Sequence, residues 1–344
     1  MLYFYTMIEI DFSTYEANHL NSIDLEVKEC VQKKTQNQNE IFLTSGTSGD
    51  KKAFEFTQEQ IQQSVKQTLE FFGLKKGDTI VNPLPLEFVA GKMNIYRAIY
   101  GELRYIQIPS KNIENNLPTA SVHFITLVPN QLHNILEVED KDFNINQILV
   151  GGGEWTDFES LKKLKNTKVF QSFASTETLT HFAIKQIYPI LDENYRVLNG
   201  FKVEESEGRL FVKHPVICPK GLYLDDLIEI KENNQFKWIG RQSNMIKSGG
   251  VKMYPEQIEK KLSNLLLQKY VIVGIADNKF GEIVVLCIEG KSAKDLIKQI
   301  SKVLNRYEVP KKIVEVNKFP LTDSGKIKRK ELIEQVKNII LNKL

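Results

Sequence analysis

The sequence is poor in cysteine, in arginine and in charge of one sign. Its 344 residues include three cysteines, Cys30, Cys218 and Cys287, which lie far apart without C-x-x-C spacing. This pattern excludes a disulfide framework and indicates buried thiols in a reducing compartment. The net charge is +3, and only seven of the 46 basic residues are arginine. We expect no nucleic-acid partner, because phosphate recognition favours a basic excess with arginine forks.

Long apolar runs and a targeting segment are also missing. The longest stretch without Asp, Glu, Lys or Arg covers residues 115–136, and its prolines and histidines exclude a membrane span. The first residues carry no basic region and soon reach Glu9 and Asp11, so they do not form a signal peptide. We therefore expect a protein of the cytoplasm with no membrane insertion.

What is present predicts an α/β fold. Short apolar runs alternate with amphipathic stretches. Strands are predicted at 41–44, 122–127, 147–153 and 167–173, the first of them buried. Thr57 and Gln60 form a capping-box pattern for a helix that Gly73 closes. Residues 209–239 alternate in hydrophobicity between turn signals, which is typical of antiparallel strands.

The pattern changes after Gly240 and Arg241. A helix is predicted from Pro255 to residue 267, followed by strands at 270–275 and 282–288, a helix at 293–304 and a strand at 313–316. About a hundred residues is near the usual size of a domain. We predict a large N-terminal domain of layered sheets and helices, residues 1–241. A smaller, mobile α+β domain, residues 242–344, would follow it.

Two segments have the composition of an anion or metal site. In the first, 44-TSGTSG-49 with Lys52, small residues let backbone N–H groups approach an anion and the lysine adds charge. It does not fit the Walker A pattern. The second, 173-FASTE-177, follows a predicted strand, where open α/β sheets bind ligands. Its hydroxyl and carboxylate groups could serve a phosphate and its Mg²⁺. Taken singly, each segment could instead be a polar surface turn, and for the second segment that interpretation is the favoured one.

Three further motifs follow in order: 223-YLDD-226, 240-GRQSNMIKSGG-250 with 254-YPEQIE-259, and 320-PLTDSGKIKR-329. Together the five motifs resemble those of the adenylate-forming superfamily of acyl- and aryl-CoA synthetases, peptide-synthetase adenylation domains and luciferases. The resemblance extends from Ile41 to the end of the chain. It implies that ATP and Mg²⁺ activate an acid as an acyl-adenylate, which then reacts with coenzyme A. The large domain would bind ATP and the acid.

The resemblance also implies roles for individual residues. Residues that would hold the ATP phosphates are Thr44, Ser45, Gly46, Thr47, Ser48, Gly49, Lys52 and Thr176. Residues that would surround the nucleoside are Gly151, Gly152, Gly153, Glu154, Phe173, Asp226 and Arg241. Glu177 would bind Mg²⁺, and Lys326 would stabilise charge between the attacking carboxylate and the α-phosphate. Lys247, Gly249 and Gly250 are also among the residues that the resemblance implies bind the cofactors. The two glycines would line the path by which the CoA thiol reaches the acyl group.

The sequence departs from the superfamily pattern in ways that suggest its substrate. Ser243 replaces the usual Asp or Lys of the hinge, and the chain is short, as in the compact o-succinylbenzoate–CoA ligases of menaquinone biosynthesis, which it resembles. A substrate with a second carboxylate needs a cationic or multiply donating anchor. Lys92, Arg97 and His181 are the candidates, and Phe88 would shape the pocket. Lys92 and Arg97 could instead flank a helix, and His181 could be a core histidine.

Three other functions stay open. The chain could be another aryl- or acyl-CoA synthetase, an enzyme that loads a carrier protein, or an inactive nucleotide-binding protein. As to oligomeric state, the chain could form a homodimer that covers the face exposed by the short N-terminal part.

Overall fold

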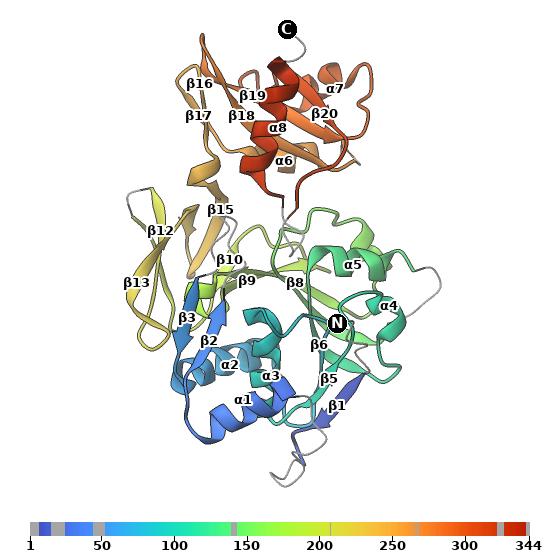
Figure 1. Cartoon of the computed structure of the whole chain (residues 1–344), viewed down its shortest axis with the longest axis vertical. Helices are drawn as coiled ribbons and strands as arrows, with labels where there is room; N and C mark the ends of the chain where they lie inside the picture. Colours follow the sequence, from blue (N-terminus) through green and yellow to red (C-terminus); the bar gives the residue numbers. More distant parts are fainter. Residues whose placement is uncertain are drawn as a thin grey trace. The chain divides into compact units, whose positions relative to one another are not determined.

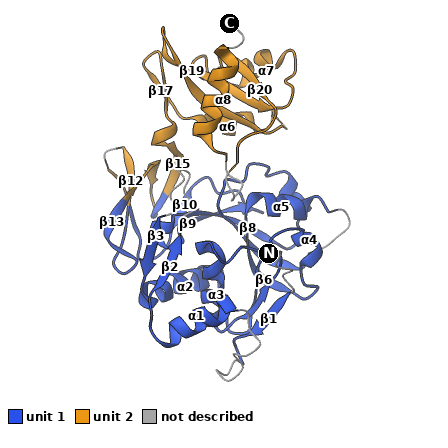
Figure 2. Cartoon of the chain, viewed as in Figure 1, with its two compact units in different colours: residues 1–203, 212–222, 233–235 blue, residues 204–211, 223–232, 236–344 orange. Residues whose placement is uncertain are grey.

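The computed structural model describes residues 7–14, 25–43, 52–138, 143–206, 208–263, 265–266, 268–321 and 327–341. The predicted phosphate loop, 44–49, and Lys326 lie outside these residues. The chain forms two compact units (Figure 2), the first made of residues 1–203, 212–222 and 233–235, the second of 204–211, 223–232 and 236–344. The boundary expected after Arg241 lies within the last of these segments, and its action as a hinge stays a prediction.

A mostly parallel sheet organises the first unit (Figure 1). The strands that the first unit contributes to this sheet are, in spatial order, β1 (Ile8–Asp11), β5 (Arg104–Gln107), β4 (Thr79–Asn82), β6 (Val122–Leu127), β7 (Ile145–Val150), β8 (Lys168–Ala174), β9 (His181–Tyr188) and β10 (Tyr195–Val197), and the order continues with β15 (Gln235–Arg241) and β14 (Asp226–Lys231). The five central strands from β5 to β8 run parallel, and β1, β9 and β10 pair antiparallel with their neighbours. The strands predicted near 122, 147 and 167 are confirmed.

Helices cover both faces of this sheet. Figure 1 shows α1 (Leu25–Thr35), α2 (Gln58–Phe72) and α3 (Val89–Gly101) grouped on one side, and α4 (Ile113–Asn116) and α5 (Pro129–Leu136) on the other. The alternation of side chains along β6 explains the two layers. Ile125 and Leu127 enter an apolar core with α5 and the 3₁₀ turn Ser160–Lys163. Phe124 points the other way and packs on Phe72 of α2, with ring centroids 4.6 Å apart.

The start of α2 confirms its predicted cap. Thr57 accepts from the N–H of Gln60 while the Gln60 side chain accepts from the N–H of Thr57, and Gly73 ends the helix with φ 64°. Before it, β2 (Glu40–Leu43) pairs antiparallel with β3 (Ala53–Phe56). The prediction of a buried strand there is wrong for alternate residues, because Ile41 and Leu43 are 55% and 43% exposed. A two-stranded ribbon buries one face only.

Five strands follow along the chain. A three-stranded sheet comprises β11 (Lys202–Ser206), β12 (Arg209–His214) and β13 (Cys218–Leu224), and β14 (Asp226–Lys231) pairs with β15 (Gln235–Arg241). The strand-rich character expected of residues 209–239 is confirmed.

Burial raises the pKa of the Cys30 and Cys287 thiols to about 12. All three cysteines are buried, as predicted.

The second unit is an α+β sandwich. Its sheet contains β16 (Ile246–Ser248), β17 (Val251–Met253), β18 (Tyr270–Asp277), β19 (Gly281–Glu289) and β20 (Lys312–Val316). One apolar core joins it to α6 (Pro255–Leu262) and α7 (Leu296–Val303), and a second joins it to α8 (Arg329–Leu341). The helix predicted from Pro255 ends five residues earlier than expected, at Leu262.

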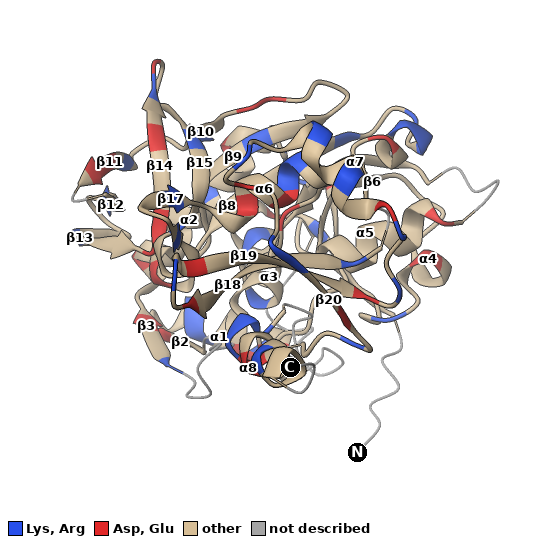
Figure 3. Ribbon diagram, turned by 90° about the horizontal axis from the view of Figure 1, so that it is seen from above, with Lys and Arg blue, Asp and Glu red and all other residues tan. Residues whose placement is uncertain are grey.

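The surface chemistry agrees with the composition. Figure 3 shows basic and acidic segments interspersed along the ribbon rather than gathered in one block. None of the helices in the described part of the chain is long and apolar enough to cross a membrane. A cytoplasmic location stays a prediction.

Candidate functional site

The turn after β7 is built around a buried glutamine. Gly152 has φ 77°, a backbone conformation that L side chains rarely adopt. Gln171 of β8 fixes both ends of this turn, because its amide donates to the carbonyl of Gly153 at 2.8 Å and accepts from the N–H of Trp155 at 3.0 Å. The turn Gly151–Glu154, which is predicted to contact the nucleoside, is therefore held by a residue that the sequence analysis missed. A polar residue within an apolar strand was the available signal.

Aromatic and charged groups lie beside this turn. Phe173 packs edge-on against Phe182 and Tyr195, with centroids 5.4 and 5.1 Å away. Lys185, which is buried on β9, places its ammonium 4.7 Å from the Tyr195 ring and 3.9 Å from a carboxylate oxygen of Glu154. Two predicted nucleotide residues, Phe173 and Glu154, are thus connected through a lysine and a tyrosine. Sequence analysis did not single out either of these.

The predicted metal residue lies on a strained turn. Thr176–Thr178 form a 3₁₀ turn, and buried Leu179 has φ 66° and ψ −48°. The N–H of Thr180 donates to the carbonyl of Thr178 at 2.8 Å, which closes a γ-turn of the rare positive-φ kind. The Ser175 hydroxyl donates to one carboxylate oxygen of half-buried Glu177. Such strain commonly marks functional sites.

The second carboxylate oxygen of Glu177 accepts no hydrogen bond from the described residues. A single half-buried carboxylate suits Mg²⁺, which keeps several waters and takes its other ligands from phosphates. The described residues contain no cluster of three His, Cys, Asp or Glu side chains that could hold a metal by themselves.

Helix α2 contacts the segment that follows the γ-turn. The Ser64 and Thr180 hydroxyls lie 2.8 Å apart, and Thr68 lies 3.2 Å from Nε2 of His181. Since the Thr68 hydroxyl donates to the Ser64 carbonyl, Nε2 of His181 carries the proton that donates to Thr68. Burial, and next the charge of Arg97, hold the pKa of His181 well below its usual value. His181 is therefore neutral at physiological pH.

Arg97 is buried, and none of the described residues supplies a counter-ion for it. Its side chain is 2% exposed, and Nη1 donates to Oδ1 of Asn94 at 2.6 Å. Nε has no hydrogen-bond partner, and among the described residues no carboxylate pairs with the guanidinium. Burial lowers the pKa of Arg97 to about 10, so the group stays charged at neutral pH. The structure thus places Arg97 and His181 in electrostatic contact, and a substrate role for either stays a prediction.

The other two substrate candidates contact β2, the strand that precedes the predicted phosphate loop in the chain. Lys92 is 3.4 Å from a carboxylate oxygen of Glu40, which is 1% exposed and also accepts from Lys33 and Tyr96, at 2.8 and 2.7 Å. Lys92 thus has a structural partner, and its substrate role stays a prediction. Half-buried Phe88 precedes α3 and forms a β-bridge with Leu43, the residue before the loop.

In the second unit, Asp226 is bound by Trp238 and Arg241. Nε1 of Trp238 donates to Oδ1 of Asp226 at 2.9 Å, and Nε of Arg241 lies 3.8 Å from the same oxygen. Burial raises the pKa of Asp226 against the opposing effect of Arg241. The Ser243 hydroxyl donates to Asp225. Gly249 and Gly250 form the turn between β16, which contains Lys247, and β17.

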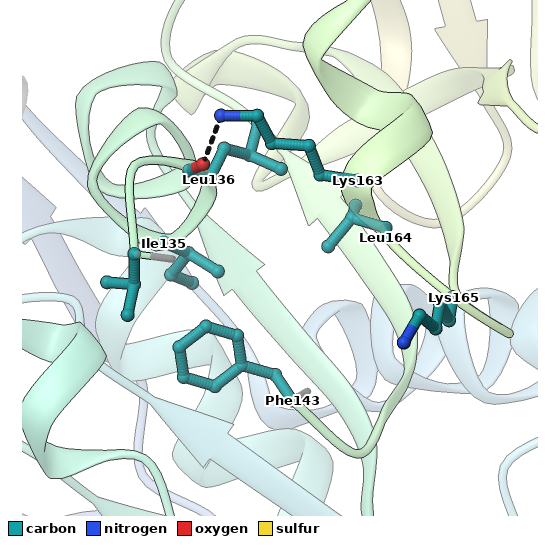
Figure 4. Close-up of a pocket in the computed structure, with 7 residues that line it drawn as sticks. Ile135, Leu136, Phe143, Lys163, Leu164 and Lys165 are labelled. Atoms are coloured by element: carbon teal, nitrogen blue, oxygen red, sulfur yellow. Dashed lines mark hydrogen bonds between the residues drawn. The ribbon is translucent and has the colours of Figure 1, made fainter. Parts of the chain in front are cut away.

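A small pocket lies away from all of these residues. Ile135, Leu136, Val138, Phe143, Lys163, Leu164 and Lys165 line it (Figure 4), and its volume of about 30 Å³ is close to that of one water molecule. The ammonium of Lys163 donates across it to the carbonyl of Leu136 at 2.9 Å. It is too small for a nucleotide or an aromatic acid.

Comparison with known proteins defines the class. The model of the AMP-binding enzyme family matches residues 8–209, and that of the AMP-binding enzyme C-terminal domain matches residues 266–326. The chain belongs to the AMP-binding enzyme family. This confirms the resemblance seen in the five motifs.

Individual relatives narrow the comparison. A 2-succinylbenzoate–CoA ligase of Listeria monocytogenes is 28% identical, over 86% of this chain and 69% of its own. The structure of an acyl-CoA synthetase (AMP-forming)/AMP-acid ligase II-like protein from Dyadobacter fermentans is 26% identical and matches with a TM-score of 0.63, over 96% of this chain and 99% of that one. O-succinylbenzoate coenzyme A synthetase from Bacillus subtilis shares the fold, with a TM-score of 0.75 at 21% identity, over 85% of this chain and 69% of its own.

Proposed function

We propose that the protein is an ATP-dependent acid–CoA ligase that forms an acyl-adenylate and then a thioester. Its acid is o-succinylbenzoate, and the products are o-succinylbenzoyl-CoA, AMP and pyrophosphate. Family membership and the Listeria relative support the reaction class. ATP, Mg²⁺ and coenzyme A are the small molecules that this reaction requires, and a homodimer stays a prediction.

The observation that carries the choice of acid is the charge of buried Arg97, which no carboxylate of the described residues pairs. Burying an ion without a partner costs several kcal/mol, about the effective penalty for one charge after relaxation. A protein that retains such a group has a use for its charge, and an anionic part of a substrate satisfies it. In an acid with one carboxylate, that carboxylate is the group that is adenylated. Only a diacid has a second carboxylate that can bind Arg97.

The residues predicted to surround the nucleotide suit the first half-reaction. The attacking carboxylate and the α-phosphate are both anionic, so catalysis depends on positioning and on cations. Glu177 would hold Mg²⁺, which neutralises phosphate charge when bound. Phe173 and the Gly151–Glu154 turn would take the adenine, and Asp226 would accept from the ribose hydroxyls.

Exchange of pyrophosphate into ATP tests this proposal. The purified protein is assayed with o-succinylbenzoate, benzoate, octanoate and 3-benzoylpropionate, which is o-succinylbenzoate without its ring carboxyl. Thioester formation with CoA is measured alongside. We expect the highest kcat/KM with o-succinylbenzoate. A higher value for any of the other acids would exclude this substrate, and no exchange with any acid would favour an inactive nucleotide-binding protein.

Arg97→Ala supplies the matched test of the anchor. A hydrogen bond to a charged group is worth about 1.5–3 kcal/mol, so KM for o-succinylbenzoate should rise about 10- to 100-fold. The same variant should change KM for 3-benzoylpropionate much less. Equal losses on both acids would show that Arg97 is structural.

A further inference from the structure

The side chain that binds the buried Arg97 guanidinium is the neutral amide of Asn94. Asn94 lies one turn before Arg97 on α3 and has no exposed surface. Its Oδ1 accepts from Nη1 of Arg97 at 2.6 Å and from the hydroxyl of Thr126 at 3.2 Å. An aspartate has nearly the same shape and would form a closed ion pair here. The chain instead places a neutral oxygen against a buried cation.

The orientation of the Asn94 amide is determined by its neighbours. Nδ2 of Asn94 donates to Oδ1 of Asn82 at 2.9 Å, so the oxygen of Asn94 must face Arg97. Asn82 is oriented in turn, because its own Nδ2 donates to Oε1 of Gln107 at 2.9 Å and to the carbonyl of Gly91 at 3.1 Å. A chain of amides therefore leads from β4 and β5 to the guanidinium and fixes its position.

The other described neighbours leave the charge of Arg97 uncompensated. His181 interacts with it electrostatically and is neutral, and Nε of Arg97 has no partner. Thr126 and Thr68 are uncharged, and Thr68 binds His181. Among the described residues, no carboxylate therefore neutralises this positive charge. A carboxylate at position 94 would do so with little change in volume.

We propose that Asn94 is a positioning residue that determines specificity for dicarboxylic acids. It fixes the Arg97 guanidinium with a neutral oxygen and so reserves the positive charge for the second carboxylate of the substrate. The inference rests on the proposed function and adds a residue to it. It implies that an aspartate at this position converts the enzyme toward monocarboxylic acids.

The test compares Asn94→Asp with wild type on o-succinylbenzoate and 3-benzoylpropionate, with kcat and KM determined separately. KM for the diacid should rise about 10- to 100-fold, the value of a charged hydrogen bond, with kcat changed much less. The kcat/KM for the monoacid should stay the same or rise. Asn134→Asp is the control for added charge, since Asn134 lies on α5, on the opposite face of the sheet from α3. It should leave the ratio of the two acids unchanged.

A second variant covers the case in which Asn94→Asp does not fold. Asn94→Leu is similar in size and removes the oxygen that positions Arg97. It should raise KM for the diacid and spare the monoacid, whereas equal losses on both would show that Asn94 only supports the fold. A diacid preference that survives in Asn94→Asp contradicts this inference alone. A wild-type preference for the monoacid contradicts the proposed substrate and the inference with it.

Discussion

Arg329 binds Glu259 with one nitrogen shared between both carboxylate oxygens, at 2.8 and 3.0 Å. The two residues lie 70 positions apart and end the motifs 254–259 and 320–329. Nη1 of Arg329 also donates to the carbonyl of Ile272 at 2.7 Å, and the N–H of Ile272 donates to Glu259 at 2.8 Å. Helices α6 and α8 are therefore joined to β18 at one point. Burial raises the pKa of Glu259 against the opposing effect of Arg329.

Breaking this pair should destabilise the protein strongly. Glu259→Gln leaves a largely buried guanidinium without its counter-ion, and removing one partner of a buried pair costs about 3–5 kcal/mol. The free energy of unfolding from urea titration is the measurement. Glu334→Gln is the matched control, because Glu334 and Lys337 form an exposed pair worth at most about 1 kcal/mol. Similar losses in both variants would show that the Glu259 contact is not a stabilising one.

Lys326 is predicted to serve adenylation only. Lys326→Ala should slow acyl-adenylate formation about 10²- to 10³-fold, the usual effect of losing one preorganised electrostatic contact. Supplied with synthetic acyl-adenylate and CoA, the same variant should form thioester at near the wild-type rate. Single-turnover assays of each step provide the measurement. Lys328→Ala, which removes an exposed lysine two positions on, should affect neither step. Parallel losses in both steps of Lys326→Ala would show that Lys326 holds the C-terminal domain in place rather than acting in adenylation.

Glu177 should set the requirement for Mg²⁺. Glu177→Gln keeps the size of the side chain and its contact with Ser175 but removes the negative charge that a hard divalent cation prefers. We expect the Mg²⁺ concentration for half-maximal adenylation to rise and the rate at saturation to fall. Titration of Mg²⁺ at fixed ATP measures both. If the titration curve does not move, the metal ligand lies elsewhere, with Asp225 the next candidate.

The affinity for ATP should fall with acidification through Asp226. The carboxylate form is predicted to accept from the ribose hydroxyls, and a raised pKa means that protonation begins at a higher pH than for an exposed aspartate. KM for ATP should therefore rise as the solution is acidified, beginning at a higher pH than an ordinary aspartate would give. Asp226→Asn should have a high KM throughout. Since ATP itself titrates, the difference between wild type and variant is the quantity to follow, and a constant difference would exclude Asp226.

Much of the fold could be predicted from local patterns in the sequence. Alternating apolar runs gave the strands β6, β7 and β8, and the capping box with Gly73 gave α2, because these signals depend on residues close together in the chain. Less of the candidate site could be predicted from the sequence. The support that Gln171 gives to the turn after β7 depends on strand register, which no local pattern records.

Arg97 shows the same limit from the other side. The resemblance and the need for a cationic anchor suggested a substrate residue, but only burial and the absence of a carboxylate partner among the described residues distinguish an anchor from a helix flank. The exposure of Ile41 and Leu43 was missed because an apolar ribbon with one covered face and a buried strand have similar compositions.

The division of the chain into units has a practical consequence for anyone who wants to study the halves separately. The first unit takes residues 212–222 and 233–235 from a region whose other segments, 204–211 and 223–232, belong to the second. A fragment ending at Val203 would lack two pieces of its own unit, and one ending at Gln235 would carry two pieces of the other. No single cut separates the units, so half-reactions are better isolated by point substitutions in the intact chain than by truncation.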